Sequence, residues 1–368
     1  MSCGDPNSLG RILDKLAADK EEFLSIIAEA CKRHNVRFVS SREQDEMSHG
    51  FVGPKTAAGL QWHIDYRELN KRIREVILRP KWLIGMTTHE EQDYYRKAAE
   101  NVCEIYGEIV DLGCWLGSTT ISLLDGCSTS DQTQNVWAFD TFIWEEYMDC
   151  MNANKQKTKK YKAGDNFKPE FVEKIGDRIN RVNLCETDLV GYKWVGDTSK
   201  ENGNRIKLLS IDVMKSPQLM KSVVENFYTN LTLGAVVIHQ DYKHWYASWI
   251  HCLQYALRHH FDVEHEVTNG TTVSFKLFKP IQSYELGLAT RFHELVCQEI
   301  EDVFEWSKSI VSKENRSQIH LAHIMAYVHR CDKTMAKATY HRLISLIDPN
   351  ADGLDSVRNA VDNMLYDV

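Results

Sequence analysis

The segment EIVDLGCWLGSTT, residues 108–120, places an acidic residue and two glycines where a buried strand turns into a helix. Glycine tolerates positive φ and lets the backbone approach a ligand closely, so Gly113 and Gly117 are typical of a turn that holds a cofactor. The acidic residue is Asp111, and the next strand candidate ends in a second one, Asp140, within VWAFDTF. A carboxylate there can accept hydrogen bonds from both hydroxyls of an adenosine ribose. The pattern predicts a nucleotide-containing cofactor at the carboxyl ends of parallel strands.

Two cofactor classes share this pair of strand-end acids, the nicotinamide dinucleotides and S-adenosylmethionine. The dinucleotide fingerprint is G-x-G-x-x-G, whereas this turn offers only Gly113 and Gly117, with Trp115 between them. Asp111 lies two residues before Gly113, and a hairpin is predicted at the end of the sheet; both features match methyltransferases better. We therefore predict methyl transfer from S-adenosylmethionine, with a nucleotide-dependent oxidoreductase as the alternative.

Polar residues also follow two later strand candidates, which end in LLSID and VVIHQD. Methyl transfer depends on positioning, and a hydroxyl acceptor must in addition lose a proton or be polarised by a metal. His239 is the predicted general base, because an unperturbed imidazole titrates near neutral pH, and His244 is its competitor. The alternative for His239 is a strand-end histidine satisfied by the backbone. Asp212 and Asp241 complete the predicted catalytic set.

Aromatic side chains are concentrated after the fifth strand candidate, in DYKHWYASWI. Aromatic rings attract a cationic or sulfonium group through contacts of about 0.5–2 kcal/mol, which keeps amine and thioether acceptors open beside hydroxyls. The other interpretation is that these rings pack in the core of a helix. The predicted acceptor-binding residues are Tyr242, His244, Trp245 and Trp144.

Short apolar runs alternate with helical stretches from Ile109 to Pro280, which is typical of a parallel sheet with crossover helices. The strand candidates are EIVDL, NVWAFD, RINRVNLC, IKLLSID and GAVVIHQD. FDVEHEV and TTVSFKLF, joined through an Asn-Gly turn signal, predict an antiparallel hairpin that closes the sheet. Helical periodicity dominates on both sides, for example from Ser8 to His34. The predicted parts are a helical N-terminal cap region (1–107), a cofactor-binding core (108–280) and a helical C-terminal extension (281–368).

The composition of the 368-residue chain restricts its partners, since the formal net charge is −8. Nucleic acids and anionic membranes normally require a basic face, so neither is expected. No run approaches the roughly 18 apolar residues of a membrane span, and the charged start predicts a cytoplasmic location. The ten cysteines form no C-x-x-C pair, which argues against a zinc ribbon or a redox motif. We expect a small-molecule substrate, and the helical ends are compatible with a homodimer.

The sequence resembles the macrocin O-methyltransferase-like branch of class I S-adenosylmethionine-dependent methyltransferases. In that branch the glycine turn has the form acid-x-Gly-x-Trp-x-Gly, to which DLGCWLGSTT is similar, and FDTF resembles its acid-Ser-Phe after the second strand. LLSID, VVIHQDY and, upstream, LIGMTTHEE extend the resemblance over Trp82 to Pro280. It implies an α/β, Rossmann-like fold with a seven-stranded, mostly parallel sheet. A non-catalytic scaffold that keeps this fold is a further alternative.

The resemblance also implies roles for individual residues. Asp111, Gly113 and Gly117 would hold the methionine part of the cofactor, Asp140 its ribose and Asp188 its adenine amino group. The predicted cofactor contacts further include Trp115, Ser118, Thr141, Asp212, Met86 and Thr87.

In the same branch, acids after the fourth and fifth strands bind magnesium. Asp212 and Asp241 fit two of these ligand positions, but Gln240 stands where the first member of an acidic or Asp-Asn pair is found in that branch. Magnesium prefers hard oxygen ligands, and the amide oxygen of Gln is a weak neutral one. A magnesium site formed by Asp212, Gln240 and Asp241 therefore stays an open prediction.

Overall fold

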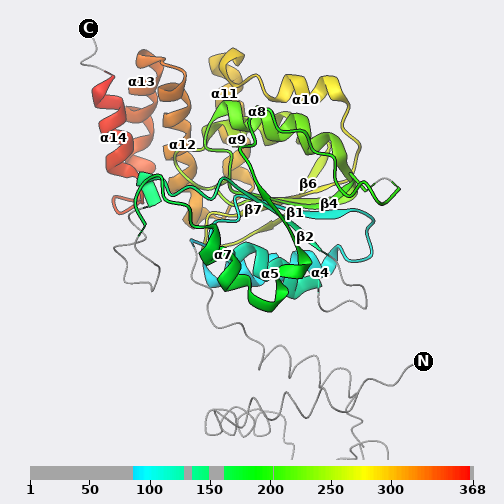
Figure 1. Cartoon of the computed structure of the whole chain (residues 1–368). Coiled ribbons are helices and arrows are strands. Elements are labelled where there is room, and N and C mark those ends of the chain that lie inside the picture. The colour runs from blue at the N-terminus through cyan, green and yellow to red at the C-terminus, as the bar shows by residue number, and fades with distance from the viewer. Residues whose placement is uncertain (1–85, 128–134, 149–160, 202, 365–368) are drawn as a thin grey trace, which may run out of the picture. The chain divides into compact units, whose positions relative to one another are not determined.

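The carboxyl ends of five parallel strands meet at one edge of a seven-stranded sheet in the computed structural model of the chain (Figure 1). The structure describes residues 86–127, 135–148, 161–201 and 203–364. They all belong to one compact unit that begins at Trp82. The predicted helix from Ser8 to His34, with most of the predicted N-terminal cap region, lies outside the described residues.

The strand order is β3-β2-β1-β4-β5-β7-β6, and β7 runs antiparallel to both of its neighbours. This order confirms the predicted seven-stranded, mostly parallel sheet with an antiparallel terminal hairpin. The strands are β1 (Glu108–Leu112), β2 (Val136–Asp140), β3 (Val182–Glu186), β4 (Ile206–Ile211), β5 (Leu231–His239), β6 (Phe261–Glu266) and β7 (Val273–Leu277).

The register of the central strands aligns their carboxyl ends. Leu112 at the end of β1 pairs with Phe139 in β2 and with Ile211 in β4. Ile211 in turn pairs with His239, the last residue of β5. Because the chain moves from β1 to β2 in one direction and reaches β4 on the other side, the strand order reverses between β1 and β4, where open α/β sheets bind ligands.

Helices cover both faces of the sheet, which explains why all five residues of β1 are buried. The helices α4 (His89–Asn101), α5 (Ser118–Cys127) and α7 (Lys168–Ile175) cover one face (Figure 1). The other face carries α8 (Pro217–Asn226), α9 (Ser248–Ala256) and α11 (Cys297–Ser309) (Figure 1). Alternate residues of β5 point to the two sides: Val236 and Ile238 pack in the core with α4 and α5, whereas Val237 packs in the core with α8 and α9.

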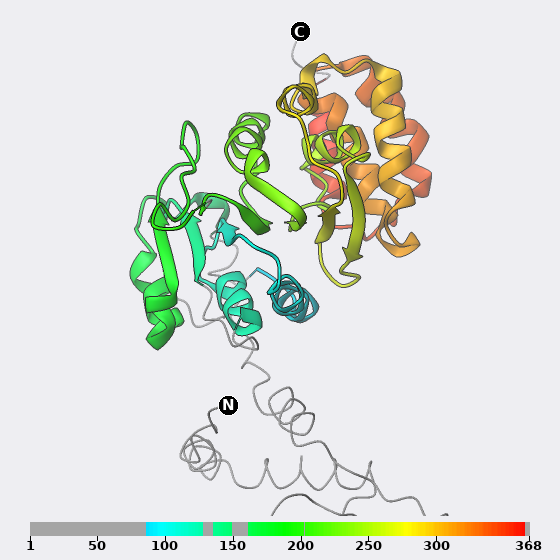
Figure 2. The ribbon, with the colours of Figure 1, turned by 90° about the vertical axis from the view of Figure 1, so that its right-hand side faces the viewer.

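After β7, all regular secondary structure in the described residues is helical, as the sequence predicts. Phe304 of α11 and Ile319 of α12 (Arg316–His329) share one apolar core with Phe275 of the sheet, so these two helices extend that core. The other side of α12 packs with α13 (Lys333–Leu343) and α14 (Leu354–Asn363) in a second apolar cluster. Figure 2 shows the hairpin and the C-terminal helices together at one end of the sheet. Helix α10 (Ser283–Ala289) precedes α11.

The strand candidate RINRVNLC is only half extended. Gly176–Arg181 forms a 3-10 helix, η4, that continues α7 after Gly176, and β3 starts at Val182. The other 3-10 turns are η3 (Glu146–Met148), η5 (Tyr228–Asn230), η6 (Phe292–Glu294), η7 (Lys313–Asn315) and η8 (Ile344–Leu346). Of the helices in the described residues, none is both long and apolar enough to cross a membrane.

Candidate active site

The turn after β1 touches the end of β4, at the point where the strand order reverses. Gly113 has φ +84°, and a Cβ atom added there would lie 2.9 Å from the carbonyl oxygen of Asp212 and 2.8 Å from Val213. Gly117, which precedes α5, has φ +90°. Both glycines have the positive φ that the sequence predicts, since an L side chain at either position would be strained and at Gly113 would also collide.

Asp111 is almost completely buried under the turn. Its Oδ2 accepts hydrogen bonds from Thr119 Oγ1 (2.8 Å) and Thr120 Oγ1 (2.7 Å), both in the first turn of α5. Burial raises the pKa of Asp111, while these hydroxyls act in the opposite direction. The carboxylate thus fixes the start of α5.

Asp140 joins the turn after β1 to the turn after β2. Its Oδ2 accepts a hydrogen bond from the backbone N–H of Trp115 (2.9 Å), and its Oδ1 accepts one from Phe142 (2.8 Å). Trp115 and Phe142 have φ values of +41° and +55°, which L residues rarely adopt. Such a conformation costs roughly 1–2 kcal/mol per residue, and hydrogen bonds to a charged acceptor offset that cost. Asp140 therefore holds both unusual turns.

The side chain of Trp115 is buried with that of Trp144. The two ring centroids lie 6.1 Å apart, within a cluster that includes Phe142, Phe167 and other side chains of α5 and α7. Trp144 is fully buried and stacks on Tyr161 at 5.1 Å. The prediction that Trp144 binds the acceptor does not fit this position, because the ring has no exposed face. Trp115 holds the loop after β1 against this cluster.

Residues 86–91, MTTHEE, which we call the cap segment, contact the start of α5. Thr87 Oγ1 donates a 3.1 Å hydrogen bond to Ser118 Oγ, so two residues of the predicted cofactor set are in direct contact although they lie far apart in the sequence. Thr87 is 8% exposed and Met86 is 40% exposed. Thr88 caps α4 with its side chain in a reciprocal pair with Glu91. The cap segment thus lies beside the N-terminus of α5, with Met86 free to contact a ligand.

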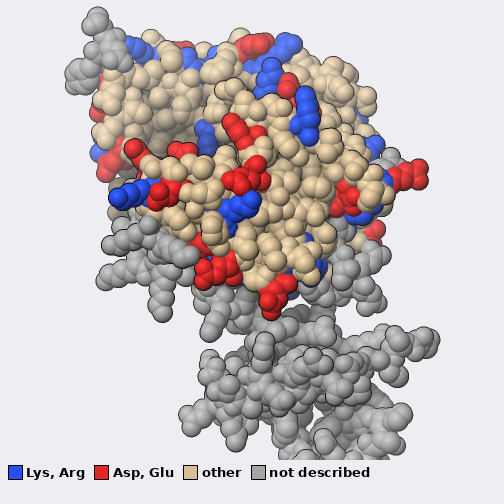
Figure 3. Space-filling model, in the orientation of Figure 1, with Lys and Arg blue, Asp and Glu red and all other residues tan. Residues whose placement is uncertain are grey.

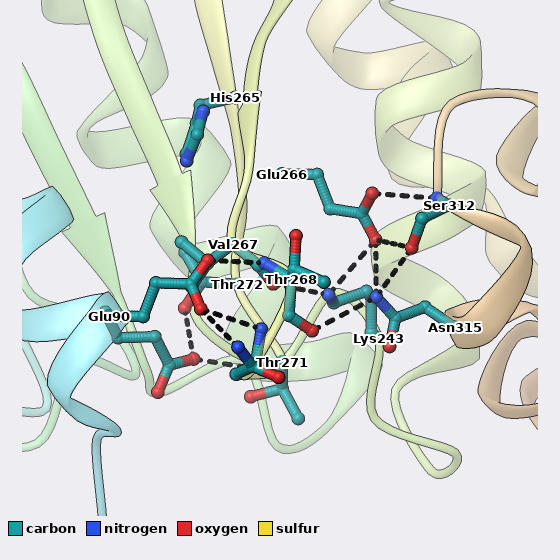
Figure 4. A network of polar contacts seen from close by, with 12 residues as sticks. Glu90, Lys243, His265, Glu266, Val267, Thr268, Thr271, Thr272, Ser312 and Asn315 are labelled. Atoms are coloured by element: carbon teal, nitrogen blue, oxygen red, sulfur yellow. Dashed lines mark hydrogen bonds and ion pairs between the residues drawn. The ribbon is translucent and has the colours of Figure 1, made fainter.

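The N-terminus of α4 is held in place by the hairpin turn between β6 and β7 (Figure 4). Glu90 accepts the backbone N–H of Thr268 at 3.0 Å, and Glu91 accepts that of Thr271 at 2.9 Å. A Cβ atom at Gly270 would lie 2.3 Å from Glu91 Oε1, so the glycine of the predicted Asn-Gly turn is needed for this contact. The hairpin turn therefore fixes the position of the cap segment.

A second set of contacts fixes the other side of the same hairpin turn. Lys243 is buried and donates to Val267 O (2.6 Å) and to Glu266 Oε1 (3.1 Å). Glu266 also accepts hydrogen bonds from the Ser312 backbone (2.7 Å) and from Asn315 Nδ2 (2.7 Å), which precede α12 (Figure 4). The loop after β5, the hairpin and the C-terminal helices are thus tied together.

Thr141 and Asp188 lie exposed at the carboxyl edge of the sheet, after β2 and β3. Asp188 Oδ1 accepts the backbone N–H of Val190 at 2.9 Å, and the Thr187 N–H donates to the Asp140 carbonyl oxygen at 2.9 Å. The ends of β2 and β3 are therefore connected, and Asp188 has acceptor capacity left for a ligand.

Asp212 and Asp241 come together at the ends of β4 and β5, with Lys215 between them. Lys215 Nζ donates to Asp212 Oδ1 at 2.5 Å, to the Tyr246 hydroxyl at 2.9 Å, and also to Asp241 Oδ2. Tyr246 in turn donates to Asp241 Oδ2 at 2.7 Å. Lys215 did not enter the predicted set; the only signal for it is a lysine three positions after a strand-end acid, in IDVMK.

The surroundings shift the pKa values of the two carboxyls in opposite directions and raise that of Lys215. Burial raises the pKa of Asp212, against the opposing charge of Lys215. Burial also acts on Asp241, but Lys215 and the Tyr246 hydroxyl outweigh it and lower the pKa of that carboxyl. The two carboxylates raise the pKa of Lys215, which stays an ammonium. Asp212 is thus the more basic of the two carboxyls.

The predicted magnesium ligands do not fit a metal site. The two carboxylates share the ammonium of Lys215, and Gln240 Oε1 accepts a 3.3 Å hydrogen bond from Tyr95 of α4. Both residues follow the last residue of β5, and their side chains diverge: Gln240 meets α4, whereas Asp241 meets Lys215 and Tyr246. Among the described residues, no group of three or more His, Cys, Asp and Glu side chains is placed to hold a metal.

His239 lies in the core and does not face the carboxyl edge of the sheet. It is fully buried, and its Nε2 shares hydrogen bonds with the Tyr228 hydroxyl (2.9 Å) and Gln254 Nε2 (2.7 Å). Burial lowers its pKa to about 3. The prediction of a general base does not fit, because His239 shares the face of Val237, which packs against α8 and α9.

Two of the aromatic residues after β5 also pack away from the strand ends. Tyr242 is fully buried and donates to Ser307 of α11 at 3.2 Å, so it does not fit the predicted acceptor contact. Trp245 lies on the backbone of Gly353, where an added Cβ would come within 2.1 Å of the indole. His244 remains partly exposed, and its ring lies tilted against that of Tyr246, with the centroids 4.3 Å apart.

The contact between Trp245 and Gly353 brings the loop after β5 against the loop before α14. The space-filling view shows a hollow beside the C-terminal helices, on a face where acidic and basic side chains are interspersed (Figure 3). These helices lie after Pro280, outside the segment that resembles the methyltransferase branch, and they border the carboxyl edge of the sheet.

No family model and no curated protein matches the chain. Several solved structures of similar arrangement are methyltransferases. The O-methyltransferase NovP is 15% identical, covers 53% of this chain and 82% of its own, and has a TM-score of 0.40. Calicheamicin methyltransferase CalS11 is 14% identical over 58% of this chain and 94% of its own, with a TM-score of 0.38. The N-methyltransferase NodS from Bradyrhizobium japonicum WM9 is 10% identical over 52% and 97%, with a TM-score of 0.29. Similarity at this level assigns no activity to the chain, whose function has to be inferred from its own residues.

Proposed function

We propose that the chain is an S-adenosylmethionine-dependent methyltransferase that acts on a small polar molecule, with a hydroxyl group as the acceptor. The observation that carries this proposal is the bond between Asp140 and the glycine turn, through the backbone of Trp115. It joins the turn after β1 to the end of β2, next to the point where the strand order reverses.

The residues at this edge suit an adenosine-containing cofactor. A carboxylate offers about four acceptor positions, so Asp140 can accept ribose hydroxyls in addition to the backbone groups of Trp115 and Phe142. Gly113 and Gly117 leave the backbone of the turn open to the methionine part, with Thr87 and Ser118 beside it. A nicotinamide dinucleotide would need a third glycine for close packing at the helix start, which this turn lacks.

When bound, the cofactor supplies an electrophilic methyl group on a sulfonium. The chain then has to position the acceptor for in-line attack and take its proton. An acceptor hydroxyl beside Asp212 and Asp241 would pass its proton to a carboxylate oxygen of this pair. The electron pair left on the acceptor oxygen forms the new C–O bond, and the electrons of the broken C–S bond stay on sulfur. Lys215 keeps a positive charge beside the developing alkoxide.

Calorimetric titration of the full chain with S-adenosylhomocysteine and with NAD tests the cofactor. We expect binding of S-adenosylhomocysteine, and tight binding of NAD alone would overturn the proposal. Asp188→Asn should weaken binding of S-adenosylhomocysteine about tenfold if this carboxylate accepts the adenine amino group. The control is Asp177→Asn, an exposed acid in η4 that lies outside the proposed site.

The acceptor is identified by incubating the protein and methyl-labelled cofactor with a metabolite extract and determining the structure of the labelled product. A product labelled on oxygen supports the hydroxyl acceptor. A product labelled only on nitrogen or sulfur would leave the methyltransferase assignment standing and reject the choice of hydroxyl.

A further inference from the structure

The ammonium of Lys215 occupies the space between the carboxylates of Asp212 and Asp241. It has three N–H donors, and three acceptors surround it: Asp212 Oδ1, Asp241 Oδ2 and the Tyr246 hydroxyl oxygen. Tyr246 uses its own proton for Asp241. Every donor of the group is therefore used, and both carboxylates are bound to one cation.

Exposure differs between the members of this cluster. The side chains of Asp212 and Asp241 are 12% and 10% exposed, whereas that of Lys215 is 35% exposed. The lysine therefore covers the two acids on their open side. A dissolved cation could reach both carboxylates only if it first displaced the ammonium.

The neighbouring oxygen and nitrogen atoms do not complete a set of ligands. The amide oxygen of Gln240 is bonded to Tyr95 on the other face of the sheet. The ring of His244 lies against that of Tyr246, and among the described residues it bonds to neither carboxylate; the residue meets Asp241 through its backbone N–H, which donates to the Asp241 carbonyl oxygen at 3.0 Å. Magnesium usually keeps several waters and binds proteins through one or two carboxylates, and here the ammonium of Lys215 lies between the two carboxylates that could hold it.

The local sequence explains why Lys215 reaches this position. Asp212 directly follows β4, and the Lys215 N–H bonds back to the Val213 carbonyl oxygen at 2.7 Å in a tight turn. Ser216 then caps α8, accepting the backbone N–H of Leu219 at 3.2 Å, and Pro217 follows as the first helical residue. The tight turn and the cap fix the backbone of Lys215 directly above the strand end.

We propose that Lys215 is the resident cation of the Asp212–Asp241 pair and takes the place of a divalent metal at the acceptor side of the site. The acceptor-side role rests on the proposed methyl transfer, whereas the absence of a metal requirement follows from the cluster itself. Lys215 is a positioning residue: it holds both carboxylates and the Tyr246 hydroxyl in one arrangement, so the acids do not need a metal to keep them together.

Titration with Mn²⁺, followed by calorimetry and by electron paramagnetic resonance, tests this proposal on the full chain. The variants are Lys215→Met, which keeps the length of the side chain without its charge, and Lys215→Arg, which keeps the charge. The matched control is Lys221→Met on α8, whose side chain is 62% exposed. We expect no stoichiometric Mn²⁺ site in the wild type, in Lys215→Arg or in the control, and one new Mn²⁺ site in Lys215→Met.

Two results would overturn the proposal. One is stoichiometric Mn²⁺ binding by the wild type that Asp212→Asn abolishes. The other is a folded Lys215→Met protein that gains no Mn²⁺ site. If Lys215→Met does not fold, the wild-type and Lys215→Arg titrations decide the question, since a metal site in either of them contradicts a resident lysine.

Binding of S-adenosylhomocysteine, measured in the same samples with excess EDTA or with magnesium, separates this proposal from the proposed function. Equal affinity in both conditions is the expected result. Failure of S-adenosylhomocysteine to bind in either condition would reject the methyltransferase, while the Mn²⁺ titration would still decide whether Lys215 is the resident cation.

Discussion

The backbone N–H of Trp115 donates a 2.9 Å hydrogen bond to Oδ2 of Asp140, which lies at the end of the neighbouring strand. Trp115 has a positive φ, and its ring packs in the cluster around Trp144. The tryptophan therefore combines a backbone conformation typical of glycine with the packing of a large apolar side chain. This arrangement explains how the turn can contain a tryptophan where a dinucleotide-binding turn has a glycine.

Asp140→Asn should destabilise the protein. The amide can replace only one of the two carboxylate acceptors, and its NH₂ group would face the N–H of Trp115 or Phe142. Hydrogen bonds to a charged group contribute about 1.5–3 kcal/mol each, so we expect a loss of roughly 2–4 kcal/mol in the free energy of unfolding, measured by urea titration. Asp188→Asn, at an exposed acid with one short-range bond, should change it by no more than about 0.5 kcal/mol. Equal losses in the two variants would contradict the role given to Asp140.

Thr119→Val removes one of the two hydroxyl donors to Asp111 without changing the shape of the side chain much. The buried carboxylate then keeps only Thr120 from the first turn of α5. We expect a loss of about 1.5–3 kcal/mol in the free energy of unfolding. Thr141→Val, at an exposed position after β2, serves as the control and should be nearly neutral. A neutral Thr119→Val would show that Asp111 does not depend on this donor.

Gly353→Ala should disturb the contact between the C-terminal helices and the loop after β5. The glycine has φ +80°, and the new Cβ would fall on the indole of Trp245. The strained backbone alone costs about 1–3 kcal/mol, so urea unfolding should show at least that loss. Gly287→Ala is the control, because nothing lies within 4 Å of its added Cβ and it sits in a helix. That substitution should be neutral or stabilise by up to about 1 kcal/mol.

His239 predicts a specific dependence of stability on pH. Its pKa is about 3 in the folded protein, because burial disfavours the charged ring, and 6.5 is the ordinary value. The unfolded chain therefore takes up a proton that the folded chain does not, and stability is lost as the pH falls from 6.5 towards 3. One such group contributes up to about 1.4 kcal/mol per pH unit.

His239→Gln should flatten the dependence of the unfolding free energy on pH by up to that amount below neutrality. At neutral pH the variant should be less stable by about 1–3 kcal/mol, since Tyr228 and Gln254 lose a buried partner. Unfolding curves measured at a series of pH values check both effects. An unchanged slope would contradict a neutral, buried His239, and a loss of methyl transfer without a loss of stability would restore it as a catalytic base.

Much of the framework could be predicted from the sequence because the signals are local. The alternation of apolar strands and helices, the turn residues Gly113 and Gly117, and the Asn-Gly signal before Gly270 each depend on residues a few positions apart. They predicted five parallel strands, a terminal hairpin and the acids at the strand ends, all of which the structure contains. The start of β3 was predicted too early, because the preceding residues continue α7 as a 3-10 helix.

The orientation of side chains at the candidate site could not be predicted in the same way. In VVIHQD the histidine and the aspartate are two positions apart, but only the histidine belongs to the strand, which ends at His239. His239 falls under α9 and is buried, while Asp241 lies beyond the strand, where Lys215 meets it. The position of that boundary depends on the register of β4 and β5 and on the helix above them.

The sequence by itself determined which acidic residues stand at the strand ends and in which order. Asp111 comes first, with the glycine turn, and is followed by Asp140, Asp212 and Asp241. Only the tertiary structure decided which of these acids face outward and what neutralises them. Asp111 accepts hydrogen bonds from α5, and Asp140 accepts them from two turns. Asp212 and Asp241 accept hydrogen bonds from Lys215. The physical reason is that spacing specifies local conformation, whereas the partner of a buried charge is fixed by how distant elements pack together.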